Sequence, residues 1–134
     1  MATPAKQTKK DNSMNQSLPF RIFGGISILR AVLFIFMTER YLASAGISAS
    51  SDSLLLAQAL GVTLFCFGLV SWRTPDIAGD GLKDYSQLFG IVTALYVVFL
   101  GYNTISGEVG GATVYVLIVV HLVLAALFFM NSKK

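Results

Sequence analysis

Three long stretches of the chain contain no Asp, Glu, Lys or Arg. They run from Ser53 to Trp72, from Tyr85 to Gly107 and from Val109 to Ser132, and contain 20, 23 and 24 residues. A helix needs about 20 residues to cross a hydrocarbon core of about 30 Å. Their apolar runs lack the alternation with polar residues that the strands of a membrane barrel show. Each stretch therefore predicts one membrane-spanning helix.

A fourth predicted span differs from the others because Arg30 interrupts it. The uncharged segments on either side of Arg30 are each too short to cross a membrane alone, so the segment spans only with Arg30 inside. Helices satisfy their own backbone amides in lipid, whereas isolated strands do not. We therefore expect an all-α integral membrane protein, an antiparallel four-helix bundle. Its spans are predicted over residues 18–45, 53–72, 85–103 and 112–131.

The segments outside the spans are polar. Residues 1–17 contain three lysines and many small polar side chains, so we expect a flexible basic tail before a transmembrane domain at residues 18–132. Pro75 is expected to end the second span, because proline disfavours helical backbone at the residue before it. The charged segment 73–84 follows. Its aspartates recur every fourth residue, which would suit metal chemistry, but two intervening glycines favour a solvated loop.

Charge is scarce and unevenly distributed. Only 13% of residues are charged, against roughly 25% in soluble proteins. Four spans place both termini and segment 73–84 on one side of the bilayer. Eight of the ten basic residues belong to that side: Lys6, Lys9, Lys10, Arg21, Arg73, Lys83, Lys133 and Lys134. Loop Lys and Arg stay cytoplasmic, so we expect cytoplasmic termini. The one-sided distribution explains the net charge of +3 as a signal of topology, so we expect no nucleic-acid partner. Which membrane holds the chain stays open.

Two basic side chains are predicted deep in the membrane. Arg30 follows Arg21 by nine residues and His121 follows Ala112 by nine, so each lies about 14 Å from a span end. A cation there costs a few kcal/mol and should face the bundle interior. For Arg30 we weigh an anion, head-group or proton site against a structural role in which helix carbonyls and polar neighbours satisfy the guanidinium.

His121 has more than one interpretation. It suits a proton relay, a hydrogen bond to a quinone or a haem ligand, but also a neutral histidine that bonds to a neighbouring helix. A membrane b-type haem usually takes two histidines and the chain has one, so we expect no cofactor. Tyr96 is predicted at a similar depth, where its ring or hydroxyl can meet Arg30. With Gln58 in the second span, these residues form the candidate intramembrane polar site.

Small residues recur along the second and third spans. Their spacings of four and seven place them on one face of each helix: Ala57, Gly61, Gly68, and Gly90, Ala94, Gly101. Such faces let helix backbones approach closely in lipid. We therefore expect spans two and three to pack tightly together, with little room for an aqueous pore. Tyr41, Trp72 and Tyr85 fall near span ends, as in an interfacial aromatic belt.

The segment from Leu54 to Pro75 carries a resemblance. It contains a small residue and a glycine four apart, a later glycine and a terminal tryptophan: Ala57, Gly61, Gly68 and Trp72. In this pattern the segment resembles small bacterial four-span proteins of the DoxX-like kind and related uncharacterised families. The resemblance implies an antiparallel four-helix bundle and supplies no catalytic residues.

Signatures of enzymes are missing from the sequence. Cys66 is the single cysteine, so there is no disulfide or CxxC pair, and no zinc-protease, phosphate-loop or serine-nucleophile motif occurs. We expect no catalytic or metal-binding residues and lean against an enzyme. Two functions remain: a non-enzymatic subunit or scaffold that associates with a membrane protein or with its own copies, and a binder or minor transporter of a lipid, quinone or ion at the polar site.

Overall fold

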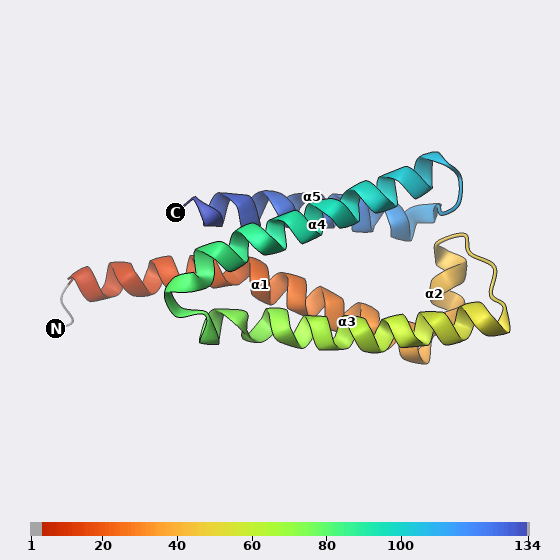
Figure 1. Ribbon diagram of the computed structural model, residues 1–134, viewed down its shortest axis with the longest axis horizontal. Coiled ribbons are helices and arrows are strands. Elements are labelled where there is room, and N and C mark those ends of the chain that lie inside the picture. The colour runs from red at the N-terminus through yellow and green to blue at the C-terminus, as the bar shows by residue number, and fades with distance from the viewer. Residues whose placement is uncertain (1–3, 134) are drawn as a thin grey trace.

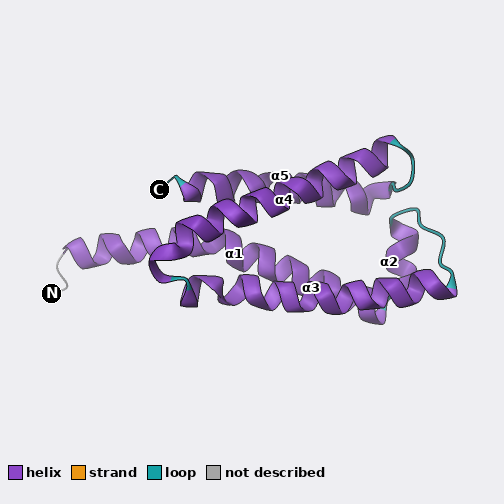
Figure 2. Ribbon diagram, in the orientation of Figure 1, coloured by secondary structure: helices purple, strands orange, loops and turns teal. Residues whose placement is uncertain are grey.

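The computed structural model describes residues 4–133, with side chains from residue 16 onward. The described chain consists of helices and short connections, and no strand occurs in it (Figure 2). The elements are α1 (Pro4–Phe36), α2 (Thr38–Ser44), α3 (Ser51–Ile77), the short 3₁₀ helix η1 (Gly79–Gly81), α4 (Leu82–Ile105) and α5 (Gly111–Ser132). Four segments are long and apolar enough to cross a membrane: Gln16–Phe36, Ser51–Ile77, Gly79–Ile105 and Gly111–Ser132. The four predicted spans are thus all present as helices.

Two predicted helix boundaries are wrong. Helix α1 begins at Pro4, so most of the segment expected to be a tail is helical, while residues 1–3 lie outside the described part. Helix α3 continues through Pro75 to Ile77. Proline is tolerated there because its fixed φ suits a helix and only one backbone bond near the helix end is lost. At its start, α3 is capped by Ser50, whose hydroxyl accepts from the Ser53 amide.

The first predicted span, residues 18–45, is not one continuous helix. It breaks at Met37, whose ψ of 33° departs from helical geometry, and resumes as α2. The hydroxyl of Thr38 donates to the Phe34 carbonyl at 2.6 Å, a bond of the kind that bends helices. Figure 1 shows α2 turned away from the line of α1, between the two long helix pairs described next.

Helices α1 and α3 form the closest pair. A Cβ atom built on Gly24 would lie 2.8 Å from the Gly68 carbonyl oxygen and 2.9 Å from the Trp72 nitrogen. Seven residues further along α1, Ala31 meets Gly61, where a Cβ would lie 3.2 Å from the Ala31 carbonyl. Glycine is required at both α3 positions because the two backbones touch. The small face predicted on the second span is therefore a packing face, but its partner is α1.

The expected packing of the second span against the third is wrong. Helices α3 and α4 make few contacts, whereas α4 packs along α5. Gly90 lies on that second pair, with a built Cβ 3.1 Å from the Phe129 ring of α5. Gly101 faces open space and Ala94 is half-buried, while Ala57 is buried against α1 and α2 side chains. On the second span the spacing marks a face that packs, whereas on the third span Gly90 makes a close contact and Gly101 does not, and the spacing assigned neither partner helix.

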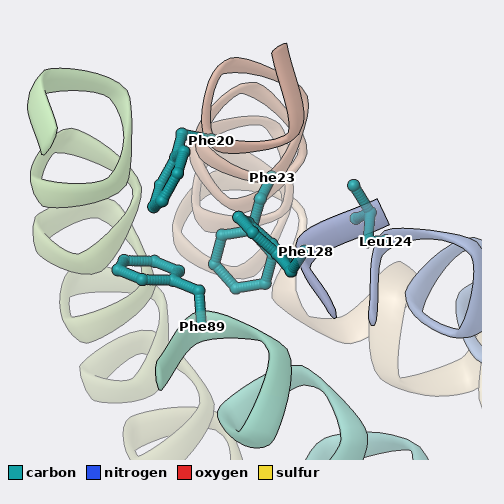
Figure 3. Close-up of a cluster of buried hydrophobic side chains, with 5 residues drawn as sticks. All are labelled: Phe20, Phe23, Phe89, Leu124 and Phe128. Carbon is teal, nitrogen blue, oxygen red and sulfur yellow. The ribbon is translucent and has the colours of Figure 1, made fainter. Parts of the chain in front are cut away.

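An aromatic cluster joins the α1/α3 pair to the α4/α5 pair (Figure 3). Its buried members are Phe20, Phe23, Phe89, Leu124 and Phe128. The Phe20 ring meets those of Phe89 and Phe128 edge-on, with centroids 5.1 and 4.9 Å away, a favoured geometry for aromatic pairs. Nearby, the Asn131 side-chain amide donates to the Gln16 carbonyl at 3.2 Å. One end of the molecule holds the end of α5, the α3–α4 connection and the part of α1 around Phe20 (Figure 1).

Polar contacts reinforce the α1/α3 pair at the same end. The buried Ser71 hydroxyl donates to the Phe20 carbonyl at 2.9 Å. The Arg21 guanidinium donates to the Trp72 carbonyl at 2.6 Å, pairs with Asp76 at 2.7 Å and lies 5.1 Å from the Trp72 ring centroid. Trp72, expected in an interfacial belt, thus also contacts a cation.

The close contact of α1 and α3 predicts the effect of Gly24→Ala. The added methyl meets backbone atoms, which cannot move aside, so we expect a loss of about 1–3 kcal/mol of stability. Gly101→Ala is the matched control, because nothing lies within 4 Å of its built Cβ and alanine favours a helix by about 1 kcal/mol. Thermal unfolding in detergent should show a lower midpoint for Gly24→Ala alone. Equal midpoints for the two variants would contradict the assigned pairing.

Candidate intramembrane site

A cavity of about 100 Å³ lies between the two helix pairs, near the middle of α3, α4 and α5. Its lining residues are Phe23, Ser27 and Arg30 of α1, Leu64 and Phe67 of α3, Val92, Thr93 and Tyr96 of α4, and His121 of α5. Three of the four residues proposed from sequence, Arg30, Tyr96 and His121, therefore border one space. The fourth, Gln58, is exposed on α3 and borders a separate surface hollow beside Glu39 and Arg40. The structure therefore does not bring Gln58 together with the other three residues.

Arg30 is buried, with 8% of its surface exposed, and is held by two tyrosines. Its Nη2 donates to the Tyr96 hydroxyl at 2.6 Å and its Nε to the Tyr41 hydroxyl at 3.1 Å. The guanidinium carbon lies 5.2 Å from the Tyr96 ring centroid, within cation–π range. Within residues 16–133, no carboxylate lies within 4 Å of Arg30, since the ion pairs there involve Arg21 and Arg73. The charge is solvated by hydroxyls and a ring but not neutralised.

Tyr41 is the residue that sequence reasoning missed. Its place near a span end predicts an interfacial position, yet Tyr41 turns inward, and its ring centroid lies 4.5 Å from that of Phe34. In a straight helix, Tyr41 would lie about 16 Å along the axis from Arg30. The break at Met37 turns α2 out of the line of α1 (Figure 1), and the Tyr41 hydroxyl lies 3.1 Å from Nε of Arg30. Only a signal for the break could have placed Tyr41 in the site, and no proline or glycine marks it.

His121 occupies the α5 side of the cavity. Its Nδ1 lies 2.7 Å from the Leu117 carbonyl oxygen, which can only accept, so Nδ1 carries a proton. This bond lies within α5, whereas we had considered a tie to a neighbouring helix. Its ring lies 4.8 Å from the Tyr96 ring and 6.1 Å from the Phe23 ring. In a neutral imidazole the second nitrogen, Nε2, is left as an acceptor.

Hydrogen-bond donors are in excess around the cavity. A guanidinium has five N–H groups, and two of those in Arg30 carry the bonds to tyrosines. Both tyrosine oxygens accept from Arg30, so each hydroxyl proton is available to another acceptor. Ser27, 3% exposed, adds a further hydroxyl at the cavity wall. The arrangement therefore suits a small group that accepts hydrogen bonds and carries negative charge.

Other candidate chemistry is not supported by the geometry. Among the side chains of residues 16–133, no group of three or more His, Cys, Asp and Glu could hold a metal ion. Asp80 and Asp84 are exposed, and Asp76 pairs with Arg21 and Arg73. The aspartates of segment 73–84 thus do not converge.

Comparison of the chain with protein-family models, with curated proteins and with solved structures finds no match.

The Tyr96 bond to Arg30 predicts a measurable cost for Tyr96→Phe. Hydrogen bonds to charged groups contribute about 1.5–3 kcal/mol, and this substitution removes only the hydroxyl. Tyr102→Phe is the matched control, because Tyr102 is on the same helix and 71% exposed. We expect the unfolding midpoint in detergent to fall for Tyr96→Phe and to stay unchanged for Tyr102→Phe. Identical behaviour of the two variants would remove Tyr96 from the Arg30 network.

Proposed function

We propose that the chain is a four-span integral membrane protein, an antiparallel bundle with cytoplasmic termini, that binds a small anionic group at Arg30. The observation that carries this proposal is the buried guanidinium beside a cavity, with neutral partners only. An ionisable side chain within a span usually marks a functional site. The bound anion would neutralise the charge and accept the unused donors.

The orientation rests on the distribution of charge. The start of α1, the α3–α4 connection and the end of α5 lie at one end of the molecule (Figure 1), and Arg21, Arg73, Lys83 and Lys133 belong to that end. The opposite end holds Arg40 as its basic residue. Because positively charged loops remain cytoplasmic, the end with the termini faces the cytoplasm.

The size of the cavity restricts the anion. An apolar cavity of about 150 Å³ holds benzene, so a space of about 100 Å³ is small for an aromatic ring. A quinone ring therefore fits less well than a carboxylate or an ion of similar size. Arg30 can donate hydrogen bonds to both oxygens of a carboxylate in the fork geometry typical of arginine. A small carboxylate is the favoured occupant.

A second function is favoured by Gln58. Its amide is exposed on the apolar surface of α3, seven residues from the first residue of that helix. Amides in spans usually bond to another helix, so Gln58 would meet a partner helix if the chain is a non-enzymatic subunit, scaffold or homo-oligomer. Extraction in mild detergent followed by native mass spectrometry separates the two functions. A stoichiometric protein partner that Gln58→Leu releases supports the second, and a retained small molecule supports the first.

The orientation predicts which cysteines an impermeant reagent reaches. In a Cys66→Ala background, Ser106→Cys lies in the α4–α5 turn and Ser132→Cys at the end of α5. We expect a charged maleimide to label Ser106→Cys on intact cells, and Ser132→Cys only after permeabilisation. The reverse pattern would invert the orientation, and labelling of both on intact cells would show that α5 does not cross the membrane.

The anion site predicts stabilisation by formate that depends on Arg30. Formate is small enough for the cavity, and gluconate at the same ionic strength controls for salt. We expect formate to raise the unfolding midpoint of the wild type and of Arg40→Gln, whose arginine is exposed on α2. Arg30→Gln should lose the response, with affinity at least about tenfold weaker, which corresponds to about 1.4 kcal/mol. An equal response in Arg30→Gln would refute the site.

A further inference from the structure

The wall of the cavity is incomplete on the side between α3 and α4. These helices make few contacts with each other, because each packs along a different partner. Val92 both lines the cavity and is 36% exposed on the outer surface of α4. Across from it on α3, Leu64 and Phe67 line the cavity and are half-buried. A residue that belongs to the cavity and to the outer surface marks an opening.

This opening differs chemically from the interior of the cavity. Its bordering side chains, Leu64, Phe67 and Val92, are apolar, whereas the charged and hydroxyl groups of Arg30 and Ser27 come from α1 on the far side. The opening lies near the middle of α3 and α4, so in a membrane it faces lipid chains and not water. A ligand that enters here has to partition into the hydrocarbon region of the bilayer.

We propose that the Arg30 site takes the carboxylate of a long-chain fatty acid, which enters from the bilayer between α3 and α4 and leaves its chain in this opening. This inference rests on the proposed anion site and adds the ligand class and its route. The carboxylate matches the guanidinium, and the cavity holds a head of that size but not the chain. The chain stays in apolar surroundings among Leu64, Phe67, Val92 and the lipid.

The opening also explains why a simple ion is a poorer ligand. An aqueous anion has to lose its hydration shell and cross part of the hydrocarbon to reach Arg30, which is costly. A fatty acid partitions into the bilayer through its chain, and its protonated form crosses apolar regions without charge. Transfer of the acid proton to Nε2 of His121, the acceptor that lines the same cavity, then leaves the carboxylate paired with the guanidinium.

The test uses the full chain in phosphatidylcholine nanodiscs and compares three probes. Formate supplies the head alone, laurate supplies head and chain, and dodecanol supplies the chain without charge. We expect laurate to raise the unfolding midpoint at concentrations about tenfold or more below those of formate, because the bilayer concentrates it at the opening. Dodecanol should have no such effect, and Arg30→Gln should abolish the effects of both acids.

A substitution at the opening separates the route from the site. Val92→Trp narrows the opening and should remove the advantage of laurate while formate still acts. Leu95→Trp, on the same helix and 63% exposed, is the matched control and should respond as the wild type does. Laurate no better than formate, or laurate binding unaffected by Val92→Trp, overturns the lateral route but leaves the anion site. Responses independent of Arg30 overturn both.

A measurement on the unmodified chain covers the case in which Val92→Trp does not fold. A fatty acid with a diazirine in its chain, activated by light in the nanodisc, should label peptides of α3 and α4 around Leu64–Phe67 and Val92–Tyr96. Excess laurate should suppress this labelling, and excess dodecanol should not. Labelling spread evenly over the exposed faces of all four long helices overturns the proposal.

Discussion

The guanidinium of Arg30 has to be solvated in the middle of an apolar helix bundle, and much of the local architecture meets this requirement. Two tyrosine hydroxyls, from α2 and from α4, take the place of water. Tyr41 reaches Arg30 because the chain breaks at Met37 and α2 turns out of the line of α1. Tyr96 reaches Arg30 from α4, which faces α1 across the cavity. Burial of one charge thus connects three helices.

The position of Arg30 in turn depends on how α1 packs. Contact of backbone with backbone at Gly24 and Gly68 holds α1 against α3. The aromatic cluster around Phe20 and Phe128 then attaches α4 and α5 near the end that holds the α3–α4 connection. At the opposite end the Gly110 amide donates to the Ala45 carbonyl at 2.9 Å, so the pairs are joined at both ends and the middle of the bundle keeps a space between α3 and α4. The cavity follows from this uneven distribution of contacts.

The same geometry connects the fold to the proposed function. A tightly packed interface between α3 and α4 would have closed the cavity and left Arg30 as a purely structural residue. Its partners leave donors unused and its charge unneutralised, and the proposed anion would complete the site. The apolar opening at Val92 makes an amphiphilic anion the chemically consistent occupant. Charge, cavity size and access from lipid all point to the same class of ligand.

Hydropathy and periodicity by themselves determined the four apolar helices, the shared level of Arg30, Tyr96 and His121 along them, and the small face that contains Gly61 and Gly68. These are local properties, since a helix needs only its own residues to satisfy its backbone in lipid. Tertiary structure decided that α3 packs on α1, that Tyr41 joins the site and that Gln58 does not. Which helices pack against each other depends on contacts between segments distant in the chain, and lipid offers little hydrophobic force to distinguish one apolar face from another. The break at Met37 has no proline or glycine to mark it, so only the folded chain shows how Arg30 is held.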